Sequence, residues 1–327
     1  MTPQEEQTIR IWSRTQTSPP KVLLAAGPGA AAQQLAEFCN RFSQLVSGLK
    51  IQQATDDPFR APAIIIGRHQ NIAYQAVPAG KELEPFLEAL AISTAAQPQL
   101  SQELDEKRAN IQLPLSLSLY VATQCPHCPQ AVRQLLPLAA ANALVRLCII
   151  DAALFGEEAG QHQIRSVPTL VLDEQFRWTG TIDVAEVLKL GIQRDPAQIS
   201  AASLRQLLEA GEAPRAAHLM LESNRIFPAL IDLLTHDRWS VRLGAMVAVE
   251  YLVDQAPNLS GQLIDPLCRR FSQLPENVQG DVVHVLGQIP DSKSRDFLAG
   301  IVSGDYSAAV KEAATEALAE QNTTLNL

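Results

Sequence analysis

The sequence predicts an α/β region built from two tandem copies of one unit, followed by an all-α region of helical repeats. The same order of expected strands and helices occurs around Pro62 and around Pro168, which are 106 residues apart, and each proline opens an apolar run of strand length. From Asp195 onward the strand signals stop and apolar residues recur at helical spacing. A chain of 327 residues has room for two or three domains.

The first α/β copy is expected over residues 21–94, after an N-terminal arm or short helix over residues 1–20. Apolar residues at helical spacing, such as Leu35, Phe38 and Phe42, predict its first helix. Its expected elements are, in order, a strand at 21–26, a helix at 30–49, strands at 51–55, 61–67 and 71–75, and a helix at 81–92. A polar segment at 95–110, a linker or a helix, joins the two copies.

The second copy is expected over residues 111–194. Its apolar runs of strand length alternate with segments of helical spacing in the order found in the first copy. The expected elements are a strand at 115–122, a helix at 126–141, a strand at 145–151, a helix at 153–164, strands at 168–172 and 176–180, and a helix at 184–192.

The region 195–327 contains three copies of one helical sequence pattern. The copies begin at Val241, Val278 and Val310, which are 37 and 32 residues apart. In each, small or apolar residues follow at offsets of four, seven and eight residues, which is one helix face, and a shorter apolar helix precedes each copy. Helix pairs at such a period are typical of a solenoid, and the region resembles HEAT-like repeats.

Composition excludes several classes of function. Apolar residues make up 46% and charged residues 19% of a chain whose net charge is −9, and residues 195–327, with 10 basic and 17 acidic residues, carry −7 of it. Nucleic-acid binding selects basic surfaces, so we expect none here. The polar, acidic start is unlike a signal peptide, and no stretch reaches the roughly 20 apolar residues of a membrane helix. We therefore expect a cytoplasmic protein without a membrane partner.

The chemistry is expected at the C-x-x-C motif formed by Cys125, Pro126, His127 and Cys128, which follows an expected strand and opens an expected helix. Helix N-termini present unpaired N–H groups and a partial positive charge, which stabilise a thiolate. We therefore expect Cys125 to attack and Cys128, one turn further in, to resolve as the second half of a redox-active disulfide. Pro126 suits the first helical turn, and a protonated His127 would add positive charge.

Two short motifs allow other interpretations. A C-x-x-C pair can be half of a zinc site, but Cys39, Cys148 and Cys268 are scattered and supply no second pair, so no metal is expected. The stretch 27–32 satisfies the dinucleotide pattern G-x-G-x-x-A, yet too few βαβ units follow for a doubly wound sheet, so we expect no cofactor.

The stretch 165–169, with Val167 and Pro168, resembles the thioredoxin fold. The resemblance implies a cis-proline loop that packs against the redox-active disulfide, with Pro168 shaping a substrate groove and the main chain of Val167 pairing with an extended client segment. Two such units with a C-x-x-C pair only in the second resemble the N-terminal domain of the flavoprotein subunit of alkyl hydroperoxide reductase and the archaeal glutaredoxin-like protein disulfide oxidoreductases. The motif and the stretches 150–155 and 166–168 carry this resemblance.

The resemblance implies a thiol–disulfide oxidoreductase acting on a protein disulfide or dithiol client, of which a peroxiredoxin is one class, with a separate reductase as electron donor. The chain departs from the family in carrying helical repeats where the flavin domain would stand. It also has Leu119 where thioredoxins carry a buried carboxylate, so the proton must be handled elsewhere. The alternative function is a redox-sensing interaction scaffold that binds proteins through the HEAT-like repeats.

Overall fold

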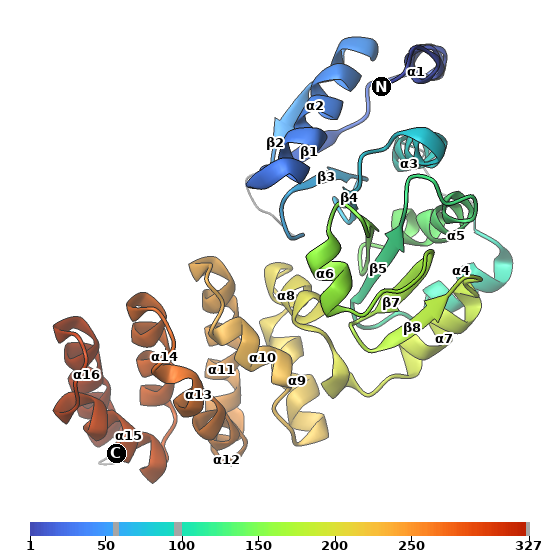
Figure 1. The fold of residues 1–327 in the computed structure, drawn as a ribbon. Helices are drawn as coiled ribbons and strands as arrows, with labels where there is room; N and C mark the ends of the chain where they lie inside the picture. Colours follow the sequence, from blue (N-terminus) through green and yellow to red (C-terminus); the bar gives the residue numbers. More distant parts are fainter. Residues whose placement is uncertain (55–58, 95–99, 325–327) are drawn as a thin grey trace. The chain divides into compact units, whose positions relative to one another are not determined.

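A computed structural model describes residues 1–54, 59–94 and 100–324 of the chain (Figure 1). The chain divides into two compact units, Met1–Arg194 and Asp195–Leu327. Among the described residues, none of the helices is both long enough and apolar enough to cross a membrane.

The first unit is organised around one eight-stranded sheet in the order β2-β1-β3-β4-β6-β5-β7-β8. Its strands are β1 (Val22–Ala25), β2 (Ile51–Gln53), β3 (Ala63–Ile66), β4 (Ile72–Gln75), β5 (Leu115–Val121), β6 (Val145–Asp151), β7 (Thr169–Leu172) and β8 (Phe176–Thr179).

The two halves of this sheet have the same topology. In the first half β1 pairs in parallel with β2 and antiparallel with β3, and β3 pairs antiparallel with β4. In the second half β5 pairs in parallel with β6 and antiparallel with β7, and β7 pairs antiparallel with β8. The halves join where β4 pairs in parallel with β6, with Ile72 opposite Leu147. The tandem copies therefore share one continuous sheet.

A buried amide reinforces this junction. The side-chain nitrogen of Asn71, just before β4, donates hydrogen bonds to the carbonyl oxygens of Ala139 (2.7 Å), Asn142 (3.1 Å) and Val145 (2.6 Å). These carbonyls lie at the end of α5 and the start of β6, in the other half. Buried carbonyls need donors, so this one side chain ties the two halves together.

Helices cover the two faces of the sheet unequally. Apolar residues of α2, α3, α5 and α7 pack on one face, whereas α6 alone among the described helices contributes to the core on the other. The helices of this unit are α1 (Pro3–Thr15), α2 (Gly29–Leu45), α3 (Leu83–Thr94), α4 (Gln102–Arg108), α5 (Cys128–Ala141), α6 (Gly156–Gln161) and α7 (Val184–Gln193), with the short 3-10 turn η1 (Gly80–Glu82) before α3.

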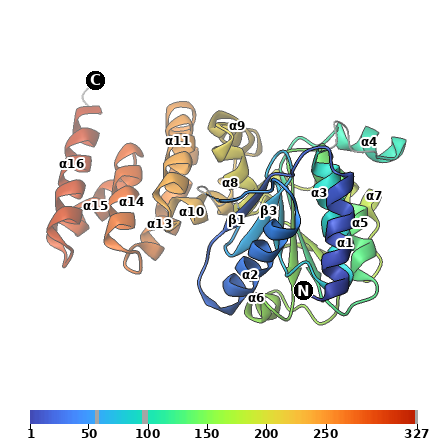
Figure 2. The same cartoon turned by 90° about the horizontal axis from the view of Figure 1, so that it is seen from above.

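The segment expected as an arm or short helix is helix α1, and it belongs to the core. Thr2 and Glu5 form a reciprocal capping box at its start, which satisfies two otherwise unpaired N–H groups. Ile9 is fully buried, and Trp12 lies against Phe42 of α2 with ring centroids 6.2 Å apart. Figure 2 shows α1 alongside α3.

Some expected element boundaries are wrong. The helix expected at 153–164 is limited to Gly156–Gln161, because Asp151 accepts hydrogen bonds from the amides of Ala153 and Leu154 and holds residues 152–155 in turns. The segment 95–110 contains α4, while its residues 95–99 lie outside the described residues, as does Thr55 of the second expected strand.

The regular elements of the second unit are all helices over its described residues, 195–324, and they form two layers. Helices α9, α11, α14 and α16 contact one another in succession, and the shorter helices between them pack alongside. The elements are η2 (Pro196–Gln198), α8 (Ala201–Glu209), α9 (Ala213–Ser223), α10 (Pro228–Leu234), α11 (Trp239–Gln255), α12 (Pro257–Ser260), η3 (Gly261–Leu263), α13 (Ile264–Phe271), α14 (Glu276–Gln288), α15 (Ser292–Ser303) and α16 (Ala308–Thr324).

The repeated helix faces predicted from Val241, Val278 and Val310 fall on α11, α14 and α16. All twelve positions of these faces are buried except Leu318, which is half-buried. The shorter helix expected before the copy at Val278, over residues 259–271, is instead α12, η3 and α13 in succession. At Gly287 of α14 the helices approach so closely that a Cβ there would lie 2.7 Å from the Cβ of Ala317 on α16.

Candidate dithiol site

Cys125 and Cys128 lie in the connection between β5 and α5, at the carboxyl end of a central strand (Figure 1). Both are free thiols. The side chain of Cys125 is 8% exposed and that of Cys128 is fully buried, so only Cys125 can be approached from solvent. Pro126 and His127, between them, are exposed.

The expectation that Pro126 occupies the first helical turn is wrong. Helix α5 begins at Cys128, and Pro129 is the proline in its first turn, where the missing N–H costs nothing. His127 is the residue that precedes the helix. Cys128 therefore starts the helix, and Cys125 lies outside it.

The sulfur of Cys125 is held between two backbone groups. The amide nitrogen of Cys128 donates a hydrogen bond to this sulfur at 3.2 Å, and the Cys125 thiol donates to the carbonyl oxygen of Val167 at 3.7 Å. The peptide bond between Val167 and Pro168 is cis, and the Pro168 carbonyl accepts from the amide of Gly180 at 2.8 Å. The structure thus brings Cys125, Cys128, Val167 and Pro168 together.

The thiol of Cys128 lies in a less polar environment. Burial raises its pKa above the ordinary value, and the side-chain hydrogen bond with Cys125 and the negative charge of Glu82 raise it further. The two sulfurs are therefore chemically unequal. The Cys125 sulfur keeps a small exposed surface and accepts a hydrogen bond from the Cys128 amide, whereas the Cys128 sulfur is fully buried and its pKa is raised.

Glu82 is a candidate site residue that the sequence analysis missed. It belongs to η1, which contacts α5, although it comes from the other half of the sheet. The residue is 1% exposed, and its two carboxylate oxygens have no hydrogen-bond partner among the described residues. Burial raises its pKa to about 7; the positive charge of Arg133 opposes this shift, and the negative charge of Asp151 adds to it.

A tight turn places Glu82 close to the helix that begins with Cys128. Gly80, two residues earlier, has a φ of 59°, a conformation that side-chain-bearing residues rarely adopt, and a Cβ there would lie 3.4 Å from the Thr123 side chain in the loop before Cys125. Thr123 in turn donates a hydrogen bond to Asp151 at 3.0 Å. Asp151 thus already accepts hydrogen bonds, whereas both carboxylate oxygens of Glu82 are without a hydrogen-bond partner among the described residues. In the sequence, the signal that pointed to such a residue was Leu119, which stands where thioredoxins carry a buried carboxylate, so that another group must handle the proton.

The first half carries a related arrangement without cysteines. The Ala61–Pro62 peptide bond is also cis, and Gly27, in the loop after β1, packs directly against that proline. A Cβ at Gly27 would lie 2.9 Å from the Pro62 nitrogen. Close packing therefore accounts for this glycine of the dinucleotide-like motif.

The other cysteines lie apart from the dithiol motif in sequence and are poorly placed to react. Burial raises the pKa of Cys39 to about 12 and that of Cys268 to about 11. Cys148 is buried and lies 3.3 Å from the side-chain oxygen of Gln75. Within the described part of the chain, no group of three or more His, Cys, Asp or Glu side chains could hold a metal ion.

Comparison with known proteins defines the fold of the second half. A family model described as a thioredoxin domain matches residues 116–191. These residues include both cysteines and the cis-proline, and this half is therefore a thioredoxin-like α/β domain. The expectation of a thioredoxin-like fold is confirmed at this level, together with a large helical region after it.

Curated relatives of the chain are redox proteins by name. The chain is 23% identical over 203 residues to the F component of the alkyl hydroperoxide reductase of Staphylococcus epidermidis, covering 61% of this chain and 39% of that protein. It is 22% identical over 251 residues to a protein named NADH dehydrogenase from Ferdinandcohnia aciditolerans, covering 73% and 47%. The chain thus spans less than half the length of these curated relatives.

Two solved structures are also similar. The NTD_N/C domain of alkylhydroperoxide reductase AhpF from Enterococcus faecalis aligns with 58% of this chain and 98% of its own, at 18% identity and a TM-score of 0.49. A protein disulfide oxidoreductase from Aeropyrum pernix aligns with 62% of this chain and 96% of its own, at 13% identity and a TM-score of 0.49.

Proposed function

We propose that this protein is a thiol–disulfide oxidoreductase that exchanges the Cys125–Cys128 dithiol with disulfide bonds of protein clients in the cytoplasm. The observation that carries this proposal is the placement of the Cys125 sulfur between the Cys128 amide and the Val167 carbonyl, beside a cis-proline. A backbone donor aimed at a sulfur favours its thiolate, which is the nucleophile in disulfide exchange.

The reaction has two steps that exchange two electrons. The Cys125 thiolate attacks one sulfur of the client disulfide, a mixed disulfide forms, and the other client sulfur leaves as a thiolate. The Cys128 sulfur, after losing its proton, attacks the Cys125 sulfur and displaces the second client thiolate. The client is reduced, and Cys125 and Cys128 become a disulfide, which a separate reductase must reduce again.

Glu82 is proposed as the group that takes the Cys128 proton. A buried thiol with a raised pKa resolves slowly unless a base is at hand. The Glu82 carboxylate influences that thiol electrostatically and has a pKa of about 7, which lets it accept and return a proton near neutrality. A carboxylate from the first half would thus replace the one that Leu119 lacks.

The client is proposed to lie across Val167 and over the exposed Pro126 and His127. Main-chain groups of an extended client segment would pair with those of Val167, as in the addition of a β-strand. His127 is exposed beside the attacking sulfur, so a protonated imidazole there would favour a departing client thiolate.

The second unit is proposed to be a HEAT-like repeat domain that positions the partner protein. Its two helix layers and its repeated buried faces support that reading. A peroxiredoxin is one class of client compatible with the named relatives. The net charge of −7 on residues 195–327 favours a partner with a basic surface.

Trapping experiments test the exchange reaction. Cys128→Ser should accumulate mixed disulfides with client proteins, whereas Cys125→Ser should not, and Cys268→Ser should behave as the wild type. Both cysteines should be needed for catalytic turnover of an insulin-type protein disulfide. A wild type that never turns over such a disulfide, although its solvent-reachable thiol is modified, would instead support the redox-sensing scaffold.

Truncation after Arg194 tests the division of labour, because the boundary separates two compact units with their own cores. The fragment should still reduce dithionitrobenzoate at about the full-length rate. Exchange with a trapped client should weaken and lose its dependence on salt. Undiminished client exchange would mean that the repeats serve another purpose.

A further inference from the structure

A pocket of about 510 Å³ lies in the second unit where α11, α14 and α16 end. These helices stand side by side in Figures 1 and 2, and α14 contacts both α11 and α16. The pocket is lined by the last turns of α11 and α14 and by Glu320 and Gln321 near the end of α16. The close approach of Gly287 to Ala317 draws two of these helices together at this place.

One wall of the pocket contains a buried acceptor. Gln321 is only 5% exposed, and its side-chain nitrogen donates to the carbonyl oxygens of Leu286 (3.1 Å) and Ile289 (2.9 Å). Because both partners are carbonyl acceptors, the side-chain atom that faces them must be the amide nitrogen. The oxygen Oε1 therefore points away from these two carbonyls. This oxygen has no hydrogen-bond partner among the described residues, nor has Oε1 of Gln288 beside it. A buried acceptor without a hydrogen bond costs free energy, so these two oxygens indicate a ligand that carries hydrogen-bond donors.

The charges around this pocket are negative. Glu250 and Asp254 line it from α11, and Glu320 lines it from α16. Glu250 and Asp254 are one turn apart on the same helix, where like charges repel, and neither forms an ion pair with another described residue. The carboxyl ends of α11 and α14 add partial negative charge. A cation bound here would relieve all of these repulsions together.

The remaining surfaces of the pocket fit an organic cation better than a metal ion. Within the described residues, these carboxylates do not form a group that could hold a metal. Val253, Pro257 and Pro290 supply apolar walls. An arginine side chain combines an apolar stem with five N–H donors in a planar fork, which can reach amide and carboxylate oxygens at once.

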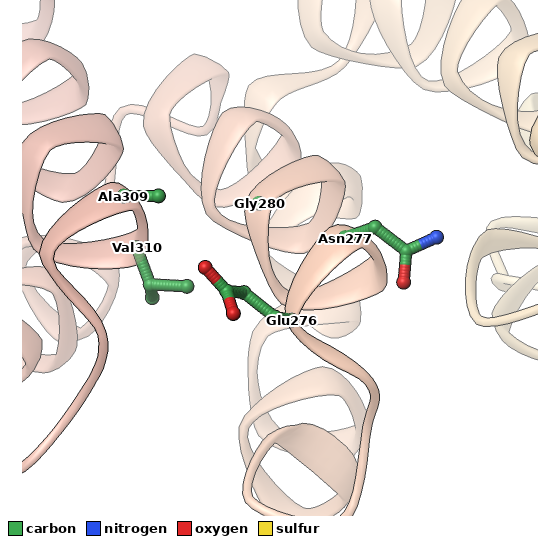
Figure 3. Close-up of a pocket in the computed structure, with 5 residues that line it drawn as sticks. All are labelled: Glu276, Asn277, Gly280, Ala309 and Val310. Atoms are coloured by element: carbon green, nitrogen blue, oxygen red, sulfur yellow. The ribbon is translucent and has the colours of Figure 1, made fainter.

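A second pocket, on α14 and α16, differs from the first in its charge. It has about 460 Å³ and lies at the opposite, amino ends of α14 and α16 (Figure 3). Its one carboxylate, Glu276, already accepts a hydrogen bond from the Ser307 hydroxyl at 2.8 Å. Helix N-termini are electropositive, so this end does not favour a cation.

We infer that the pocket formed by Glu250, Asp254, Glu320, Gln288 and Gln321 binds an arginine side chain of a partner protein. The inference extends the partner-positioning role proposed for residues 195–327, and it does not depend on the dithiol chemistry. Glu250, Asp254 and Glu320 would face the guanidinium, the two glutamine oxygens would accept its N–H groups, and the prolines would pack on its stem.

The test titrates the full-length, reduced protein with the acetylated tripeptide amide Leu-Arg-Leu at low ionic strength. Amide resonances of Gly287 and of the Gln321 side chain report on the pocket in ¹H–¹⁵N spectra. Both should shift saturably. The same peptide with citrulline, which has the shape of arginine without its charge, should bind at least about tenfold more weakly. The double substitution Glu250→Gln with Asp254→Asn should weaken arginine binding by about tenfold or more.

The matched control is Glu312→Gln with Glu316→Gln, which removes two exposed carboxylates from α16 away from the pocket. It should bind the peptide like the wild type. Absence of shifts at Gly287 and Gln321, equal binding of the citrulline peptide, an equal loss in the control, or the same shifts with MgCl₂ alone would overturn the inference. Dithionitrobenzoate reduction by the same variants should stay unchanged, and a loss there would contradict the proposed division of labour between the two units instead.

Discussion

The backbone amide nitrogen of Cys128 lies 3.2 Å from the sulfur of Cys125. Through this contact the residue proposed to resolve the mixed disulfide also donates a hydrogen bond to the residue proposed to form it. The amide is one of the unpaired donors at the start of α5, so it can stabilise negative charge on Cys125 without giving up a helix hydrogen bond. Cys128 keeps its own sulfur buried.

Selective alkylation should reveal this asymmetry. In the reduced protein at pH 7.5, iodoacetamide should modify Cys125 at least about tenfold faster than Cys128, because the Cys125 sulfur is reachable and has a stabilising donor. Peptide mass spectrometry at successive times measures both rates, and buried Cys39 serves as the unreactive reference. Equal rates at the two cysteines would contradict the assigned roles.

Glu82→Gln should slow the resolving step. A neutral amide cannot accept the Cys128 proton, and loss of a general base costs about 10²-fold or more in rate. In the wild type the single-turnover rate should fall as the pH drops below about 7, where Glu82 becomes protonated, and the variant should lose this inflection. Glu84→Gln, two residues away on the exposed surface, should retain the wild-type profile. A variant with an unchanged rate and inflection would remove Glu82 from the mechanism.

Stability should also depend on Glu82. Its pKa rises from the ordinary 4.5 to about 7 on folding, so the protonated carboxyl favours the folded state. This stabilisation is complete below about pH 4.5 and is lost as the pH rises through about 7, a change of about 3 kcal/mol. Urea unfolding at pH 5 and pH 8 should therefore show a smaller loss of stability for Glu82→Gln than for the wild type. Parallel losses in the two proteins would mean that the folded-state pKa is not raised.

Gly287→Ala should destabilise the second unit by about 1–3 kcal/mol, because the new Cβ would overlap with that of Ala317. Gly280→Ala is the matched control on the same helix: nothing lies within 4 Å of its added Cβ, so it should stabilise by about 0.5–1 kcal/mol. Adding Ala317→Gly to Gly287→Ala should restore part of the loss. Thermal unfolding followed by circular dichroism distinguishes these outcomes, and equal effects of both alanines would contradict the close approach.

Periodicity made much of the fold predictable from sequence. Val241, Ala245 and Val249 recur at helical offsets, and this spacing predicts a helix with one apolar face. In the structure that face of α11 is buried. Likewise, the prolines that open β3 and β7 marked the same position in the two α/β copies. These signals are local, so a single sequence suffices to read them.

Interactions between the halves could not be read in this way. Glu82 looks like an ordinary acidic residue at the start of a helix, and only the pairing of β4 with β6 carries its segment to Cys128. Asn71 gives no periodic signal either, because its three acceptors lie 68 to 74 residues away in the chain. The starting residue of α5 differs from the expected one because Pro126 and Pro129 both suit a first turn, and the tertiary fold decides between them.

The continuous sheet has a consequence for how such a protein could be divided or evolve. In a symmetric dimer, one protomer can complete the site of its partner, but then every protomer carries the same residues. In the proposed mechanism the same complementation occurs within one polypeptide, because one half carries the C-x-x-C pair and the other half carries Glu82. Expressed as two pieces, the halves should regain chemistry only on reassociation, as a split enzyme does.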